Sequence, residues 1–330
     1  MLAFHSIFKD ELGEHLALKQ KTTTKESCKQ TRRILHDFDR HLVQSGLSEK
    51  VVSETTVNGW IRTLSAKNAK RTVSDKVSCV RKFLEYLGYC GFPAFIPISP
   101  KYGNDYVPYI FSDEDVVEIF KAADNPDIRK EHPGACHTRY AFPMLLRLLY
   151  SCGLRLGETL ALRMRDINFA DGTLRIIHAK NNKQRIVPMQ KELTEMLRRY
   201  CAAMRIIGKP EAFLFPEDKP QQPLTQGAVR YVFKKTLIKS GVYIPPETPN
   251  KRNQCLHCFR HLFAIKSFAQ AESAGRAVHE SVPFLSVYLG HFDMDGTEKY
   301  LKFGADMFPE HADMFEAYAE GVFPEVRHEE

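Results

Sequence analysis

Residues 172–189 read GTLRIIHAKNNKQRIVPM, and this stretch decides the fold class because its periodicity differs from that of the chain around it. Residues 172–180 and 184–189 each alternate apolar and polar side chains as strands do, and the NNK between them is turn chemistry. We therefore expect a two-stranded hairpin within a small sheet. On both sides the apolar spacing returns to three and four residues, which is typical of helices. The sequence thus predicts a mainly α protein with a small antiparallel β sheet (α+β).

Helices are expected on both sides of this hairpin. Before it they cover residues 111–125, with Ser112 as the N-cap, then 141–153 and 154–169. After it they cover residues 191–208, a stretch that begins at Thr225, and then 255–271 and 282–291.

A proline-rich stretch divides the chain into two predicted domains. Residues 91–112 hold four prolines, and proline biases the residue before it away from helix. Residues 1–95 have helical spacing, with Ser53 or Thr55, and Ser74, as expected N-caps. We predict a helical domain at 1–95, a linker at 96–112 and a second domain at 113–330 that ends in a tail helix at about 306–325.

Charge is distributed in blocks along the 330 residues, whose formal net charge is +7. Residues 1–108 carry a net charge of +6, residues 109–305 carry +8, and residues 306–330 carry −7. Two basic blocks suit a polyanion, because Lys and Arg at phosphates release counterions. A mildly basic enzyme with no nucleic-acid partner fits the charge equally well. The acidic tail is better suited to packing on protein than to contacting DNA.

The sequence favours neither a membrane protein nor a secreted one. No apolar run approaches the ~18–20 residues needed to span a bilayer. Residues 1–15 lack the basic region and apolar stretch of a signal peptide. The cysteines are scattered over a long chain, whereas a disulfide framework is dense in a short one. We therefore expect reduced thiols, a cytoplasmic location and no membrane partner. The eight cysteines are residues 28, 79, 90, 136, 152, 201, 255 and 258.

Residues 255–261, CLHCFRH, permit three interpretations: a metal site, a redox pair, or a functional His257 and Arg260 between bystander cysteines. A structural zinc site needs about four ligands, usually from separated segments, and the sequence has no second CxxC. A thioredoxin-like pair would follow a strand in a βαβ unit. The third interpretation is favoured, since His257 and Arg260 lie three apart and share a helix face.

Other polar residues stand out less sharply by themselves. Arg155 follows a glycine break at the start of a helix, with Glu158 three residues on, and a local ion pair would explain both. Lys180 lies near the hairpin tip, where a solvated turn lysine is the simpler interpretation. His291 and Tyr300, taken alone, fit structural roles.

The order of these residues carries more weight than any one of them. LRLGETLAL, AKNNKQRIVP, HCFRHLFA and LGH, with a tyrosine nine residues later, resemble the catalytic domain of phage-integrase-type tyrosine recombinases. That family's signature is Arg, Lys, His-x-x-Arg, His or Trp, and Tyr, in that order. The resemblance covers roughly residues 109–305, and it extends to 1–108 only as a helical domain of suitable size. The matching positions are Arg155, Lys180, His257, Arg260, His291 and Tyr300.

The resemblance implies an enzyme that breaks and rejoins DNA strands. Arg155 and Arg260 would clamp one phosphate, because arginine stays charged and donates bidentately. Tyr300 would be the nucleophile of a covalent 3′-phosphotyrosyl intermediate. By the same resemblance His257 would act as base, Lys180 would protonate the leaving 5′ oxygen and His291 would donate to the phosphate.

Glu158 would orient Arg155. We expect no cofactor: the arginines replace a metal ion, and the phosphotyrosine replaces ATP by keeping the bond energy. Lys183 competes with Lys180 for the same role, and Tyr288 and Tyr318 compete with Tyr300. Tyr288 has apolar neighbours and is expected in the core, and Tyr318 lies in the acidic tail.

The expected partner is double-stranded DNA with specific recombination sites, in mobile-element integration, excision, transposition or resolution. A homotetramer on DNA, accessory proteins and a nucleoid-associated location are further expectations. Three rival functions are a type IB topoisomerase, a catalytically inactive DNA-binding relative and a zinc-binding regulator. Candidate DNA contacts in the first domain, each of which would otherwise lie on a solvated face, are Arg32, Arg33, Lys67, Lys70, Arg71, Lys76, Arg81 and Lys82.

Overall fold

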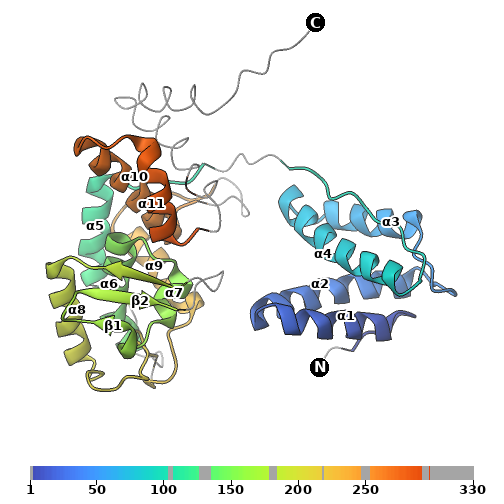
Figure 1. Ribbon diagram of the computed structural model, residues 1–330, viewed down its shortest axis with the longest axis horizontal. Helices are drawn as coiled ribbons and strands as arrows, with labels where there is room; N and C mark the ends of the chain where they lie inside the picture. The colour runs from blue at the N-terminus through green and yellow to red at the C-terminus, as the bar shows by residue number, and fades with distance from the viewer. Residues whose placement is uncertain are drawn as a thin grey trace, which may run out of the picture. The chain divides into compact units, whose positions relative to one another are not determined.

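The computed structural model describes residues 3–102, 107–125, 135–177, 184–217, 219–246 and 253–291, together with Thr297. The chain divides into two compact units, Met1–Asp105 and Tyr106–Glu330. In Figure 1 the first unit runs from blue to cyan and the second from green to red. The boundary between the units falls inside the linker that the sequence predicts.

The first unit consists of helices in its described residues. They are α1 (Lys9–Thr22), α2 (Lys25–Gln44), α3 (Glu54–Ser65) and α4 (Lys70–Tyr89). The Thr24 hydroxyl caps α2 by accepting from the Ser27 amide, and Ser53 caps α3 by accepting from the Thr56 amide. Their apolar faces meet in one core around Leu12, Leu35, Phe38, Trp60, Val77 and Phe83.

Ser74 is not an N-cap, which corrects the sequence prediction. The helix begins at Lys70, with Ala69 at the cap position, so Ser74 lies one turn inside α4. Its side chain is buried, as are those of Val73 and Val77, two core residues of the same helix. Helix α4 therefore begins four residues before Ser74, the residue that the sequence suggests as its N-cap.

The buried His15 of α1 makes the stability of the first unit depend on pH. Burial, assisted by the charge of Lys19, lowers the pKa of His15 from 6.5 to about 4. The unfolded chain therefore takes up a proton first, and stability is lost as the pH falls from 6.5 towards 4. The full loss is about 3 kcal/mol.

This loss is measurable by denaturant unfolding followed through the fluorescence of Trp60, the chain's single tryptophan, which is buried in the same core. We expect His15→Phe, which removes the titrating group, to flatten the pH dependence between 6.5 and 4. Equal slopes for the variant and the natural protein would contradict this assignment.

Both ends of the proline-rich stretch, residues 91–112, pack into a core. Phe92, Phe95 and Ile96 lie against the core of the first unit, where the Phe95 amide donates to the carbonyl of Val52. At the other end Phe111 is buried in the core of the second unit. The second unit therefore begins before residue 113, because the apolar residues among the prolines are buried.

The second unit is helical except for one small sheet in its described residues. Its elements are α5 (Asp113–Asp124), α6 (Ala135–Cys152), α7 (Leu156–Ala161), the 3₁₀ helix η1 (Met164–Asp166), β1 (Ile167–Asn168), β2 (Thr173–Ile176), β3 (Arg185–Pro188), α8 (Lys191–Ala203), α9 (Gln226–Lys239), α10 (His257–Ser273) and α11 (Val278–Leu289). Ser112 caps α5 and Thr225 caps α9, as the sequence predicts. The described residues include no helix long and apolar enough to cross a bilayer.

The sheet is antiparallel, with the order β1-β2-β3. Its register pairs Leu174 with Val187 and Ile176 with Arg185. Leu174, Ile176 and Val187 point into the core, so the alternation read from sequence is the alternation of buried and exposed faces. The predicted mainly α fold with a small antiparallel sheet is confirmed.

The helix predicted over 154–169 is too long. In the structure α7 ends at Ala161 because Leu162 has an extended backbone, and η1 and β1 follow. Strand β1 pairs with β2 through Ile167 and Leu174. Hydrogen bonding to a neighbouring strand, which helical spacing does not reveal, decides this segment.

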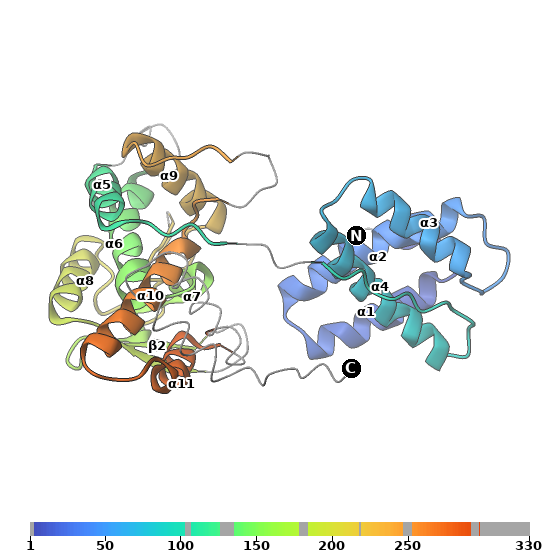
Figure 2. The same cartoon turned by 90° about the horizontal axis from the view of Figure 1, so that it is seen from above.

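Helix α6 is the centre of the second unit. It packs against α5, α7, α8, α9 and α10. Figure 2 shows these helices around it. Its largely apolar sequence follows from this position, since a helix that packs against five neighbours keeps only a narrow exposed stripe, which here includes Tyr140 and Arg147. The arrangement places the end of α6 and the start of α7 beside α10.

Candidate active site

Arg155 sits at the junction between α6 and α7, in the N-cap position of α7. The break that precedes it depends on Gly153, which has φ +58. A Cβ on Gly153 would lie 2.5 Å from the Phe263 ring, so only glycine lets α6 end this close to α10. The glycine break that drew attention to Arg155 in the sequence therefore has a packing cause.

Arg260 lies three residues into α10 and is 1% exposed. Its Nη1 donates to the Gly153 carbonyl at 2.8 Å, and its Nη2 donates to the Leu289 carbonyl at 2.6 Å. The guanidinium therefore joins the end of α6 to the end of α11 from within α10. An arginine this deeply buried is tolerated only because carbonyl acceptors replace its water.

The carbonyls that end α11 bring the two arginines together. Arg155 Nη1 donates to the Leu289 carbonyl at 3.3 Å and its Nη2 donates to the Gly290 carbonyl at 3.0 Å. Arg155 and Arg260 thus share Leu289 as an acceptor. The negative end of the α11 dipole adds a favourable field for both cations. Gly290 ends the helix with φ +66, a conformation that favours glycine.

Glu158 is held between two arginines and its side chain is 3% exposed. Arg155 reaches Oε1 from Nη1 at 2.8 Å, and Arg185 reaches Oε2 from Nη2 at 2.7 Å. Burial alone would raise the pKa of the Glu158 carboxyl, but the hydrogen bonds and charges of Arg185 and Arg155 hold that pKa below its ordinary value. The predicted contact between Arg155 and Glu158 is present.

His291 follows the end of α11 and contacts Arg260 directly. Its Nε2 lies 3.0 Å from Arg260 Nη2, and its Nδ1 lies 2.6 Å from the Thr297 hydroxyl. Because a guanidinium only donates, Nε2 is the acceptor and the imidazole proton lies on Nδ1, donating to Thr297. A chain of contacts therefore runs from Arg155 through Leu289 to Arg260 and His291.

His257 is the first residue of α10, one turn before Arg260, and is exposed. Its ring lies 4.7 Å from the buried ring of His261, at an interplanar angle of 81°. Burial, followed by the charges of His257, Arg260 and His291, lowers the pKa of His261 to about 3. His261 is therefore neutral at pH 7, and a second charge beside Arg260 is avoided.

The cysteines of CLHCFRH face each other across the first turn of α10. Their Sγ atoms are 3.7 Å apart, and Cys258 is fully buried in the main core. The hydrogen bond to Cys255, and then burial, raise the pKa of the Cys258 thiol. Within the described residues, no group of three or more His, Cys, Asp and Glu side chains is placed to hold a metal ion.

Lys180, Tyr300 and two of their competitors, Lys183 and Tyr318, lie outside the described residues. The third competitor, Tyr288, is half-buried, and its ring stacks on Phe263 with centroids 5.3 Å apart. Burial raises the pKa of its phenol. Tyr288 therefore packs against the core, whereas the sequence predicts it within the core.

Sequence reasoning missed Arg185, the first residue of β3. Its side chain is 8% exposed and pairs with Glu158. A signal was present, because alternation along a strand places Arg185 on the same face as the buried Val187. A charge on the inward face of a strand calls for a buried partner, and the partner here comes from α7.

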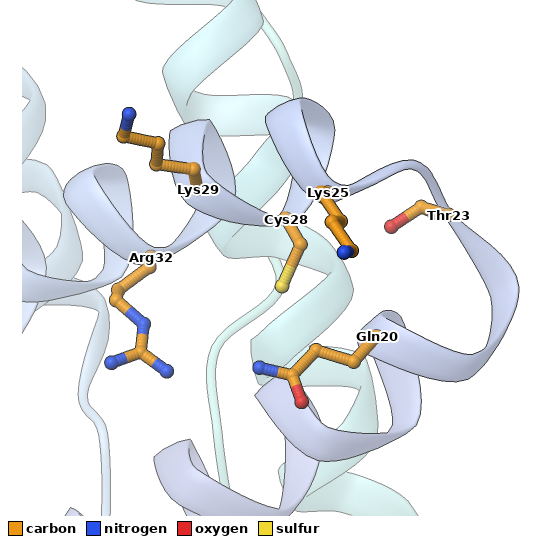
Figure 3. A pocket seen from close by; sticks show the side chains of 6 residues that line it. All are labelled: Gln20, Thr23, Lys25, Cys28, Lys29 and Arg32. Carbon is orange, nitrogen blue, oxygen red and sulfur yellow. The ribbon is translucent and has the colours of Figure 1, made fainter. Parts of the chain in front are cut away.

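The candidate DNA contacts all belong to α2, α4 or the segment before α4, and the structure leaves each of them exposed or half-buried. Arg81 forms an ion pair with Glu85 at 2.9 Å, and Arg71 stacks on Tyr102. Arg32 borders a hollow of about 450 Å³ between the end of α1 and the start of α2 (Figure 3). Two further α2 cations, Lys25 and Lys29, line the same hollow and were not predicted.

The sequence that forms the second unit matches a known family. Residues 110–303 match the model of the phage integrase family. This is more than half of the chain, which therefore belongs to that family: it is a tyrosine recombinase, an enzyme that breaks and rejoins DNA strands.

Relatives and solved structures agree with this assignment. Tyrosine recombinase XerD of Rickettsia conorii is 24% identical over 306 residues, which cover 86% of this chain and 90% of the relative. XerH bound to its difH substrate matches with a TM-score of 0.67 and 16% identity, over 92% of this chain and 84% of that one. A lambda integrase tetramer on a Holliday junction matches with a TM-score of 0.62 and 14% identity, over 90% and 78%. At these identities the structures establish the shared fold.

Proposed function

We propose that the protein exchanges strands between specific DNA sites through a covalent bond from Tyr300 to the 3′ phosphate. The observation that carries the proposal is the meeting of Arg155 and Arg260 at the Leu289 carbonyl. Two permanently charged, bidentate donors from different segments are what a pentavalent phosphate requires on its non-bridging oxygens. The order of the remaining family residues supports the same chemistry.

In the proposed reaction the Tyr300 oxygen attacks phosphorus while its proton passes to His257. The bond to the 5′ oxygen breaks, and Lys180 supplies the proton to that oxygen. Religation reverses these transfers on a new 5′ hydroxyl. The arginines neutralise the phosphate throughout, so we propose neither metal nor nucleotide as a cofactor. Glu158 fixes Arg155 by the contact described above.

His291 needs a change of protonation to donate to the phosphate. In the DNA-free chain its Nε2 accepts from Arg260, and its one imidazole proton lies towards Thr297. When a phosphate draws the Arg260 guanidinium, Nε2 no longer accepts from it, and the imidazole proton can lie on Nε2 instead of Nδ1. His291 then donates to a non-bridging oxygen.

The proposed substrate is double-stranded DNA, and the first unit supplies part of the binding surface. Lys25, Lys29 and Arg32 are spaced four and three apart on α2 and border one hollow, which supports contact with the phosphate backbone. XerH bound to difH supports the same substrate by likeness of fold. Integration, excision or resolution of a DNA element, in the cytoplasm and at the nucleoid, is the proposed setting.

The proposal is tested with a nicked suicide substrate that carries the candidate site, in a buffer that contains EDTA. We expect a covalent protein–DNA adduct and, with an intact pair of sites, recombinant products. Relaxation of any supercoiled plasmid without a site requirement would favour a type IB topoisomerase. Binding without an adduct would favour a DNA-binding relative that has lost catalysis, and bound zinc in the purified protein would favour a regulator.

The acidic tail is proposed to dock on a neighbouring protomer in a tetramer. The apolar residues Met314, Phe315, Tyr318 and Val322 have helical spacing, and the lambda integrase tetramer supports the assembly. We expect deletion after Phe308 to leave DNA binding intact and to reduce synapsis and recombination. Gel-shift and recombination assays on the two-site substrate measure both. Unchanged recombination in the shortened chain would contradict the role.

A further inference from the structure

We propose that Arg185 is a positioning residue of the active site, which holds Glu158 and thereby fixes the guanidinium of Arg155 for the phosphate. The inference rests on the proposed function, which gives Arg155 its role at the phosphate. Arg185 is not among the residues that the family signature supplies. It is identified by what it touches.

The contacts of Glu158 are shared equally between two arginines. Oε1 accepts from Arg155 Nη1 at 2.8 Å and from Arg185 Nη1 at 3.2 Å. Oε2 accepts from the Arg155 amide at 3.2 Å and from Arg185 Nη2 at 2.7 Å. Arg185 therefore supplies half of the donors to a buried carboxylate. Without it, Glu158 would be bonded on each oxygen by Arg155 alone.

Arg185 also touches the second anchor of Arg155. The Gly290 carbonyl accepts from Arg155 Nη2, and a Cβ on Gly290 would lie 2.9 Å from Arg185 Nη1. Two of the three groups that accept from the Arg155 guanidinium, Glu158 and Gly290, thus lie against Arg185. Any side chain at position 290 would displace the Arg185 guanidinium and disturb the end of α11.

The position of Arg185 in the sheet also links the ion pair with Glu158 to the β2–β3 hairpin. Arg185 pairs with Ile176 at the end of the β2–β3 ladder, five residues after Lys180 in sequence. The ion pair to Glu158 ties this end of the ladder to α7. One side chain therefore connects the segment that bears Arg155 with the strand that follows Lys180.

Charge explains why a second arginine is needed. A buried Glu158 paired with Arg155 alone would form a neutral pair and draw the Arg155 guanidinium towards itself. Two arginines around one carboxylate leave a net positive charge, and the carboxylate is satisfied by Arg185. Arg155, whose side chain is 22% exposed, then keeps donor capacity for a phosphate oxygen.

The test compares Arg185→Ala and Arg185→Lys with Arg175→Ala as the matched control. Arg175 lies on the adjacent strand β2 and approaches Asp166, and its side chain is half-exposed. It pairs with Ile186, so it lies on the opposite face of the sheet from Arg185. Single-turnover cleavage of the suicide substrate, DNA affinity and thermal unfolding are measured for each variant. Glu158→Gln and the double variant of Glu158 and Arg185 complete a cycle.

We expect Arg185→Ala to slow cleavage by about 10-fold or more with unchanged DNA affinity, as for other residues that orient a functional group through a partner. Arg185→Lys, which can bond one carboxylate oxygen, should recover part of the rate. The double variant should be no slower than the slower single variant. Arg175→Ala should cleave normally.

Normal cleavage by a folded Arg185→Ala protein, or additive effects in the double variant, would overturn the proposal. If Arg185→Ala fails to fold, Arg185→Lys decides: a lysine variant that cleaves at the natural rate also overturns it. The Nε–Hε signal of Arg155 in ¹⁵N spectra gives a readout without DNA and should broaden in the variants. If the natural protein forms no adduct, the proposed function fails, and an unchanged Arg155 signal would then overturn the positioning role separately.

Discussion

Replacement of Tyr300 by phenylalanine is expected to abolish the covalent protein–DNA adduct while DNA binding stays intact. The hydroxyl oxygen is the atom that would bond to phosphorus, and phenylalanine keeps the ring but has no nucleophile. The adduct is measured by denaturing electrophoresis after incubation with the nicked suicide substrate. We expect the yield of the adduct to fall to background, since no other side chain is expected to form the bond to phosphorus.

The matched control is Tyr288→Phe, which also removes a phenolic oxygen. Tyr288 stacks on Phe263 and lies in the packed region between α10 and α11. We expect this variant to form the adduct as the natural protein does. An adduct that persists in Tyr300→Phe, or is lost in Tyr288→Phe, would show that a tyrosine other than Tyr300 is the nucleophile.

Replacement of Arg260 by alanine is expected to slow cleavage by at least ~100-fold, which corresponds to roughly 3 kcal/mol of transition-state stabilisation, as for loss of one oxyanion donor. The guanidinium would no longer meet the phosphate. His291 would also lose its contact to Arg260. Single-turnover rates on the suicide substrate measure the effect apart from binding.

Part of the effect of Arg260→Ala will appear as lost stability. From α10, the Arg260 side chain donates to the Gly153 carbonyl at the end of α6 and to the Leu289 carbonyl at the end of α11. Its removal leaves both carbonyls without this donor and opens a buried space between the three helices. Thermal unfolding separates this loss from the loss of rate. Arg147→Ala, which breaks the ion pair with Asp124 on the same unit, is the control and should cleave at the natural rate. Comparable rates for Arg260→Ala and Arg147→Ala would contradict the assignment of Arg260 to the phosphate.

Local sequence signals were most informative where a short segment decides its own conformation. The alternation in GTLRIIHAK and QRIVPM predicts strands because strand side chains point to opposite faces. Ser112 and Thr225 predict helix starts because a hydroxyl satisfies the first amides of the helix that follows. The same logic was wrong for Ser74 and for 154–169, where packing and strand pairing decide.

The spacing of HxxR and the ordered family residues were sufficient to identify the class of enzyme and to mark Arg155 and Arg260 as candidate phosphate ligands. They do not show which groups accept hydrogen bonds from those arginines. Arg155 meets the Gly290 carbonyl across 135 residues, and Arg260 meets the Gly153 carbonyl across 107. Such contacts depend on how α6, α10 and α11 pack, and no local periodicity encodes them.

The sequence by itself determined the mainly helical class, the small sheet and the order of the candidate catalytic residues, because each is carried by a local pattern or a motif. Only the tertiary structure decided that the end of α11 joins Arg155 to Arg260, and that Arg185 shares Glu158 with Arg155. The reason is physical: a buried charge must find its partners wherever the packed chain offers them, and those partners are distant in sequence.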